Sequence, residues 1–361
     1  MPYEDGARDQ GGAALSREEY VESYRQLSRT VHDAGLMRRR YGFYVTRIGG
    51  WVLLLAGLLA AVVLLGATWF QLIIAALIGL VMAQLGFLAH EAAHREIFAS
   101  RTRNEWASRL IACLLMGLSF NWWMAKHNTH HAHPNRENTD PDIESNLLAL
   151  TPAAADRREG LSAWLARRQG YFFVPLLLLE GLNLHVASLR MLFSARDVPH
   201  RVTEIALIAV RHAAYLTLLF LVLPVGMAFA FVGVQVGTFG LLLGGAFALN
   251  HIGMPTVPAG VHLDFLRRQV RMSRNIDDGP LSRLLLGGLQ FQVEHHLFPA
   301  VPRPNLPALQ TLVREHCSRL GIPYTQESLS GAAVTVVAYL NQVGLKNRDP
   351  FACPLVQRYR G

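Results

Sequence analysis

Residues Ile48–Ala89 read IGGWVLLLAGLLAAVVLLGATWFQLIIAALIGLVMAQLGFLA. These 42 residues contain no Asp, Glu, Lys or Arg. A transmembrane helix needs roughly 20 apolar residues to cross the hydrocarbon core of a bilayer, so the stretch is long enough for two. The stretch His212–Leu263 is charge-free over a further 52 residues and has the same capacity. The sequence therefore predicts an all-α integral membrane protein with four transmembrane helices, arranged as two hairpins.

The charges outside these stretches predict the orientation. Arginines flank the outer ends of both hairpins, whereas the turns near 67–70 and 224–226 carry no charge. Positive residues favour the cytoplasmic side of a membrane, so the outer ends are expected there. The apolar but interrupted segments 106–123 and 170–192 are predicted to lie in the membrane interface, because tryptophan and tyrosine mark them. The formal net charge of +8 fits cytoplasmic loops facing anionic lipid better than nucleic-acid binding.

These features divide the chain into three predicted parts. Residues 1–47 form a cytoplasmic N-terminal arm, residues 48–310 form the membrane domain with a cytoplasmic cap, and residues 311–361 form a cytoplasmic tail. Nearly all basic residues are arginine, since Lys126 and Lys346 are the only lysines. This bias suggests a GC-rich bacterial genome, so the expected location is a bacterial cell membrane with the active site facing the cytoplasm.

Histidines gather in three short clusters near the predicted cytoplasmic helix ends, and His251 lies where the fourth crossing emerges. Residues three or four positions apart share one face of a helix, so each cluster directs its side chains to one point. Because neutral imidazole is the commonest metal ligand, we predict a shared metal centre in the cap. Its candidate ligands are His90, His94, His127, His130, His131, His251, Gln292, His295 and His296.

The size of this set favours two metal ions. Zinc takes about four ligands, so one zinc would leave half of the set unused. Imidazole-rich sites suit iron, zinc, copper or nickel, and oxidation of a lipid chain requires iron or copper. Two iron ions are therefore the expected cofactors, with no catalytic group beyond the metal centre. Glu91, Glu294 and His133 are expected to orient the imidazoles.

One motif supports a different function. His90-Glu91-Ala92-Ala93-His94 matches the H-E-x-x-H signature of zinc metalloproteases, in which the glutamate is the general base. An intramembrane zinc metalloprotease is therefore an alternative, although it leaves the other histidine clusters without a role.

The clusters resemble the three histidine boxes of the membrane fatty acid desaturase family, H-x3-H, H-x2-H-H and Q-x2-H-H. The resemblance includes HNTHHAHPN at 127–135, TDPD at 139–142 and QVEHHLFP at 292–299, and it covers about residues 45–310. A glutamine opening the third box is similar to the front-end branch, many members of which carry a fused cytochrome b5 domain. The His-Pro-Gly-Gly motif of that domain does not occur here, so no such domain is expected.

The resemblance implies an oxidoreductase that uses O2 and two electrons at a non-haem di-iron centre to introduce a double bond into a fatty acyl chain. It also implies that His251 is an iron ligand and that Asn250 orients the ligands. The implied partners are a fatty acyl substrate, carried as acyl-CoA or acyl lipid, membrane lipids, and a separate electron donor of ferredoxin or cytochrome type with its reductase. An acyl hydroxylase of the same di-iron type is a further alternative, because related oxygenases share such boxes.

Overall fold

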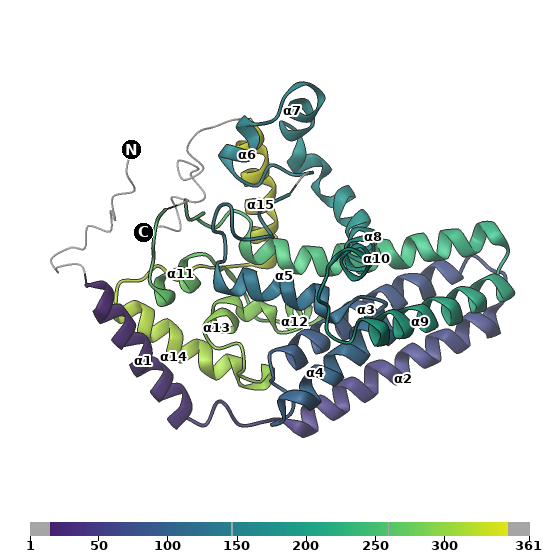
Figure 1. The fold of residues 1–361 in the computed structure, drawn as a ribbon, viewed down its shortest axis with the longest axis horizontal. Helices are drawn as coiled ribbons and strands as arrows, with labels where there is room; N and C mark the ends of the chain where they lie inside the picture. The colour runs from purple at the N-terminus through teal and green to yellow at the C-terminus, as the bar shows by residue number, and fades with distance from the viewer. Residues whose placement is uncertain (1–14, 146, 259, 346–361) are drawn as a thin grey trace.

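The computed structural model describes residues 15–145, 147–258 and 260–345, and this part of the chain is mostly helical (Figure 1). Four long helices coincide with the four predicted crossings: α2 (Tyr41–Leu65), α3 (Gln71–Ala93), α9 (Arg201–Val222) and α10 (Val225–His251). Each pair is joined by a short turn. In the first turn the buried Gln71 side chain donates hydrogen bonds to the carbonyl oxygens of Val62 and Gly66, both at 2.8 Å.

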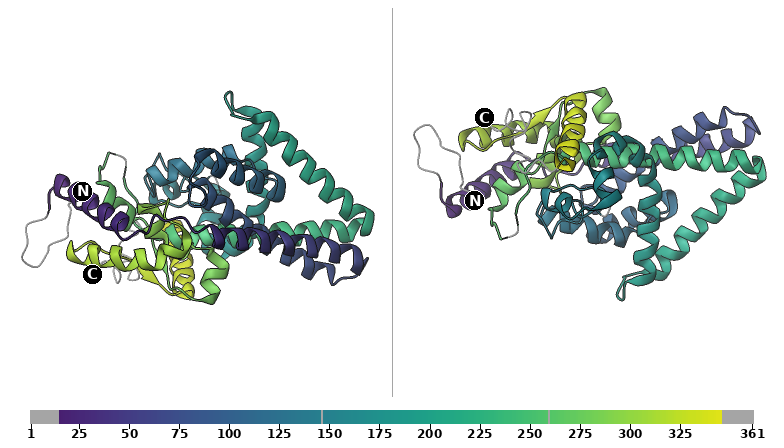
Figure 2. Two further views of the ribbon diagram at one scale, coloured as in Figure 1. Left: turned by 90° about the horizontal axis from the view of Figure 1, so that it is seen from below. Right: turned by 90° about the horizontal axis from the view of Figure 1, so that it is seen from above.

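A fifth helix, α8 (Gln169–Ser194), is also long and apolar enough to cross a membrane. The sequence analysis assigned most of this segment to the membrane interface. Figure 2 shows α8 running across α10 rather than beside it. The crossing point is made of glycines, because a Cβ on Gly181 would lie 2.3 Å from the Val236 carbonyl oxygen and one on Gly240 would lie 2.2 Å from the Gly181 nitrogen. The described part of the chain thus holds five apolar helices of membrane-spanning length, one more than predicted.

Shorter elements gather where α3 and α10 end and form the cap that carries the histidine clusters (Figure 1). Apart from a parallel pairing of β1 with β2, these elements are helical. Their bounds are α1 Arg17–Asp33, α4 Arg101–Leu110, the π-helix η1 Ile111–Met116, α5 Phe120–Ala132, α6 Pro152–Asp156, α7 Gly160–Ala166, α11 Phe265–Arg271, β1 Asn275–Ile276, α12 Pro280–Leu286, the 3-10 helix η2 Leu289–Phe291, α13 Gln292–Leu297, the 3-10 helix η3 Arg303–Asn305, α14 Leu306–Arg319, β2 Gln326–Glu327 and α15 Leu329–Gly344.

Two apolar cores hold this arrangement together. The first joins the long helices and includes Ile78 of α3 and Phe239 of α10. The second lies in the cap, where Leu27 of α1, Val270 of α11 and Val313 of α14 belong to one buried cluster. The predicted N-terminal arm therefore packs, through α1, against the segments that carry the third histidine cluster.

Residues 311–345 pack on the rest of the described chain. A boundary at residue 310 falls inside α14, and α15 lies against α8 and α10. α15 also approaches α7 closely at Gly344, where an added Cβ would overlap the Ala166 carbonyl oxygen. Residues 1–14 of the predicted arm and 346–361 of the predicted tail lie outside the described residues.

A buried ion pair fixes α9 relative to the cap. The Arg109 guanidinium on α4 lies 3.1 Å from the Glu204 carboxylate on α9, and both side chains are almost fully buried. Glu204 also accepts hydrogen bonds from Ser119, the N-cap residue of α5, and from Asn121 within that helix, each at 2.5 Å. Because α5 carries the second histidine cluster, this network fixes its position against the membrane helices.

Candidate metal centre

Five of the predicted ligands form the first histidine group. His90 lies in the last turn of α3, His94 caps that helix, His127 and His131 lie on α5, and His295 lies on α13. One ring nitrogen from each lies within 4.8 Å of the others. The closest Nε2–Nε2 distances are 2.8 Å between His94 and His127, 3.1 Å between His90 and His127, and 3.1 Å between His131 and His295.

The second histidine group consists of His130, His251 and His296, whose ring nitrogens also lie within 4.8 Å of one another. In each ring Nδ1 has a hydrogen-bond acceptor. Asp140 accepts from His130 at 3.0 Å, the Met272 carbonyl accepts from His251 at 3.0 Å, and the Gln269 side-chain oxygen accepts from His296 at 2.9 Å. A proton on Nδ1 leaves the Nε2 lone pair available, which is the tautomer that a metal needs on that atom.

Unpaired ring nitrogens indicate that these groups fit metal ions. Within the described chain, His130 Nε2 and His296 Nε2 are buried and have no hydrogen-bond partner. In the first group several Nε2 atoms face one another at 2.8–3.1 Å. Two nitrogens bound at right angles to one metal, each about 2.1 Å from it, would be separated by about 3.0 Å. Both groups therefore have the donor chemistry and the spacing of a site for imidazole-binding metals.

Burial keeps most of these imidazoles neutral. Burial lowers the pKa of His94 to about 3 and holds the pKa values of His127, His131, His295 and His296 well below the usual value. His130 differs. Burial acts to lower its pKa too, but the hydrogen bond that His130 donates to Asp140 and the charges of Asp142 and Asp140 raise it overall. Neutral rings avoid competition between protons and a metal for the same lone pair.

Gln292 lies beside the second histidine group. Its side-chain nitrogen is 2.9 Å from His251 Nε2, and its side-chain oxygen accepts a hydrogen bond from Asn250 at 3.0 Å. In this arrangement the oxygen faces Asn250. A half-turn of the amide would present the oxygen to the histidines and would give up the bond to Asn250. Asn250 thus contacts a predicted ligand, as expected of an orienting residue.

The other three side chains predicted to orient the ligands lie differently. Glu91 forms an ion pair with Arg303, and Glu294 accepts hydrogen bonds from Asn275 and Tyr324, both at 2.7 Å. These partners are not imidazoles, so the two carboxylates fix the backbone of α3 and α13 rather than a ring. His133 caps α5 and belongs to neither histidine group.

Three functional contacts were missed by the sequence analysis. Asp140 was noted only as part of the TDPD stretch, although its carboxylate holds His130. Gln269 lies among the arginines of α11, and nothing in its local sequence distinguishes it. Trp123 stacks on His127 with ring centroids 4.2 Å apart and was interpreted only as an interfacial residue. Of these three contacts, only that of Asp140 has a signal in the sequence, namely a carboxylate ten residues after the candidate ligand His130.

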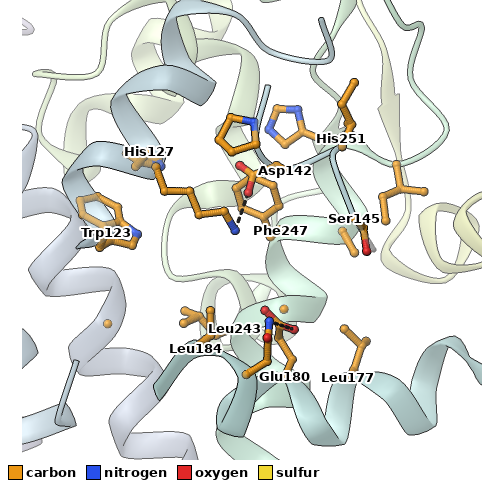
Figure 3. Close-up of a pocket in the computed structure, with 18 of the residues that line it drawn as sticks. Trp123, His127, Asp142, Ser145, Leu177, Glu180, Leu184, Leu243, Phe247 and His251 are labelled. Atoms are coloured by element: carbon orange, nitrogen blue, oxygen red, sulfur yellow. Dashed lines mark hydrogen bonds and ion pairs between the residues drawn. The ribbon is translucent and has the colours of Figure 1, made fainter. Parts of the chain in front are cut away.

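A cavity of about 570 Å³ adjoins both histidine groups. His90, His127, His251 and Gln292 form part of its wall. Most of the remaining lining is apolar and includes Phe87 and Met116. Leu184, Leu243 and Phe247 belong to the same apolar lining (Figure 3). The volume and lining are those of a site for a small or chain-like apolar ligand. The cavity therefore brings such a ligand next to the candidate metal ligands.

Comparison with known proteins identifies related chains. A family model described as "Fatty acid desaturase" matches residues 67–328. The chain is 28% identical to a Delta(8)-fatty-acid desaturase of Borago officinalis over 351 residues, 93% of this chain and 78% of that protein. It is 30% identical to the Delta(6)-fatty-acid desaturase fat-3 of Caenorhabditis elegans over 319 residues, 84% of this chain and 71% of that protein. A Delta 8-(E)-sphingolipid desaturase of Emericella nidulans is 29% identical over 366 residues, 93% of this chain and 64% of that protein.

Proposed function

The chain belongs to the fatty acid desaturase family, and from this premise we propose that it introduces a double bond into a fatty acyl chain, using O2 and two electrons at a non-haem di-iron centre. As a member of this family it is an oxidoreductase, and its apolar helices make it a multi-pass membrane protein. The observation that carries the proposal is the apolar cavity whose wall includes members of both histidine groups.

The nine predicted ligands divide between two sites. His90, His94, His127, His131 and His295 would hold one iron, and His130, His251 and His296, with Gln292 beside them, would hold the other. When bound, the iron pair supplies the O2 activation needed to remove two hydrogens from adjacent methylenes. Asp140, Gln269 and the Met272 carbonyl keep Nδ1 protonated in the second group and so direct Nε2 inward. Phe247 lies against His130 and His251 and positions the chain beside them.

The reaction requires a source of electrons outside the metal centre. Removal of two hydrogens with reduction of O2 to two waters consumes two electrons and two protons in addition to the substrate hydrogens. Three scattered cysteines, Cys113, Cys317 and Cys353, cannot hold an iron–sulfur cluster. We therefore propose a separate donor of ferredoxin or cytochrome type with its reductase, attracted by the basic cytoplasmic loops.

We further propose four crossings, with α8 in the interface and the histidine groups on the cytoplasmic side. The steep crossing of α8 over α10 in Figure 2 supports this arrangement. Single cysteines at Thr68, in the first turn, and at Gly226, at the start of α10 beside the second turn, should react with a membrane-impermeant maleimide from outside the cell only. Labelling of either turn from the cytoplasm would overturn the topology. A bacterial membrane rests on the arginine bias alone, and the relatives named above come from a plant, a worm and a fungus.

Two alternatives are less well supported. An acyl hydroxylase would use the same cavity and ligands, but all three relatives named above are desaturases. A zinc metalloprotease would need Glu91 as a free general base, whereas that carboxylate is paired with Arg303. Both considerations favour desaturation.

The direct test is expression of the full chain in a host whose fatty acids are then profiled by mass spectrometry. The wild-type chain should produce a new double bond, and His94→Ala should abolish it. His32→Ala provides the control, because His32 is exposed on α1, away from both groups. A new hydroxyl group in place of a double bond would support the hydroxylase. Unchanged lipids, with iron present in the purified chain, would contradict the proposal.

A further inference from the structure

The cavity wall carries charged side chains. Lys126 on α5 forms an ion pair with Asp142, with 2.7 Å between Nζ and Oδ1. Glu180 on α8 accepts a hydrogen bond from Asn183 at 3.1 Å. All four side chains line the cavity, and Figure 3 shows the Asp142 and Glu180 carboxylates entering it from opposite sides. A ligand in the cavity therefore passes between charged groups of two separate elements.

These charged side chains adjoin the candidate metal centre. The second oxygen of Asp142 lies 3.3 Å from His130 Nδ1. Lys126 directly precedes His127, which lines the same cavity. A substrate group held by Lys126 and Glu180 would consequently lie in the same cavity as His127 and His251.

The charges discriminate between possible ligand groups. A plain methylene chain would remove water from the ammonium and the carboxylates and would return no hydrogen bond. A substrate carboxylate would add negative charge to a wall in which the Asp142 and Glu180 carboxylates already act on one ammonium, that of Lys126. An ester or thioester carbonyl accepts from Lys126 but has nothing to donate to Glu180. A hydroxyl or an amide can do both.

We propose that the cavity selects a long-chain lipid carrying a hydroxyl or amide group, which accepts a hydrogen bond from Lys126 and donates one to Glu180. This inference rests on the proposed acyl desaturase function and names the chemistry of its substrate. It also makes Lys126 and Glu180 specificity-determining residues, because their position relative to the histidine groups sets which carbons of the bound chain lie beside the metal.

The test measures binding without turnover. The full chain is purified into lipid nanodiscs and kept anaerobic and unreduced, and four matched probes are titrated: palmitamide, methyl 2-hydroxypalmitate, methyl palmitate and palmitate. A hydrogen bond to a charged group typically changes affinity by roughly 10–100-fold. At least one of the first two probes should bind that much more tightly than methyl palmitate, and the tighter of the two identifies an amide or a hydroxyl substrate. Equal binding of methyl palmitate or palmitate would overturn the inference.

Two variants locate the effect. Lys126→Met and Glu180→Leu should each reduce the preference to about threefold or less, with binding of methyl palmitate kept. Arg190→Met is the matched control, because Arg190 is exposed on α8 and does not line the cavity. If the preference for the amide or the hydroxy ester over methyl palmitate persists in both variants, other residues cause it and the proposal is contradicted. If Lys126→Met fails to fold, the wild-type and Glu180→Leu titrations still decide.

The two hypotheses fail in distinguishable ways. If the wild-type chain forms no double bond in the host, the proposed reaction is wrong, whatever the binding data show. If it forms one but binds methyl palmitate as tightly as the amide and the hydroxy ester, only the substrate selection is wrong.

Discussion

Replacing Asp140 by asparagine should remove one of the two irons. Asp140 is fully buried and accepts from His130 Nδ1, from the Asn135 backbone at 2.7 Å and from the Asp142 backbone at 3.0 Å. The amide of asparagine keeps one oxygen, so its NH2 group must face a donor. Loss of such a partner typically weakens metal binding about 10–100-fold, or about 1.4–2.8 kcal/mol. One unpaired buried donor costs about 1–3 kcal/mol of folding free energy in addition.

The assay is iron per chain in anaerobically purified protein over a chelator series. Wild type should hold close to two irons, and Asp140→Asn should lose one of them at a roughly 10–100-fold lower chelator concentration. The first histidine group lacks His130, so the iron held there should remain. Asp33→Asn, on the exposed surface of α1, is the control. If Asp140→Asn retained both irons at every chelator concentration that wild type tolerates, the role assigned to this carboxylate would be refuted.

Three further outcomes are expected. If the Gln292 amide binds iron, Gln292→Ala should lower double-bond formation by orders of magnitude, to the level expected for His295→Ala. Near-normal product with full iron content would remove Gln292 from the ligand set. Chelator-treated protein should lose stability as the pH falls below about 6.5, because unfolded imidazoles take up protons that buried ones such as His94, with a pKa of about 3, do not. Equal melting temperatures at pH 7.5 and 5.5 would contradict that expectation. Gly181→Ala should lower the free energy of unfolding by several kcal/mol, because its Cβ would lie 2.3 Å from a backbone oxygen. Gly233→Ala has no neighbouring atom within 4 Å of its Cβ and should leave the melting temperature unchanged.

Local patterns predicted the parts of this molecule that depend on neighbours in sequence. Charge-free stretches located α2, α3, α9 and α10, because hydrophobic length alone decides whether a helix fits a bilayer. They missed the first seven residues of α2 and the first eleven of α9, which contain arginine. The i, i+4 spacing predicted that His90 lies with His94 and His127 with His131, because such positions share one helix face. It did not predict that His130 and His296 leave their neighbours in sequence and form the second group with His251.

Contacts between distant segments could not be derived in this way. Gln269 holds His296 from 27 residues away, and its own neighbours suggest only a basic surface helix. Similarly, Glu91 pairs with Arg303 across 212 residues. Its neighbours in sequence are histidines, and they suggested that Glu91 orients an imidazole. The length of α8 likewise gives no indication of its direction, which depends on the glycine crossing with α10.

The first histidine group spans the chain from His90 to His295, and this has a consequence for the newly made protein. At about 5–20 residues per second, the ribosome needs roughly 10–40 s to progress from the first of these ligands to the last. Early in that interval, before His127 and His131 are made, His90 and His94 lie on a helix without partner ligands, and until His295 follows the group is incomplete. An i, i+4 histidine pair is a competent partial site for zinc or copper. Incorporation of the wrong metal is therefore a hazard of the growing chain, and it ends when α13 docks.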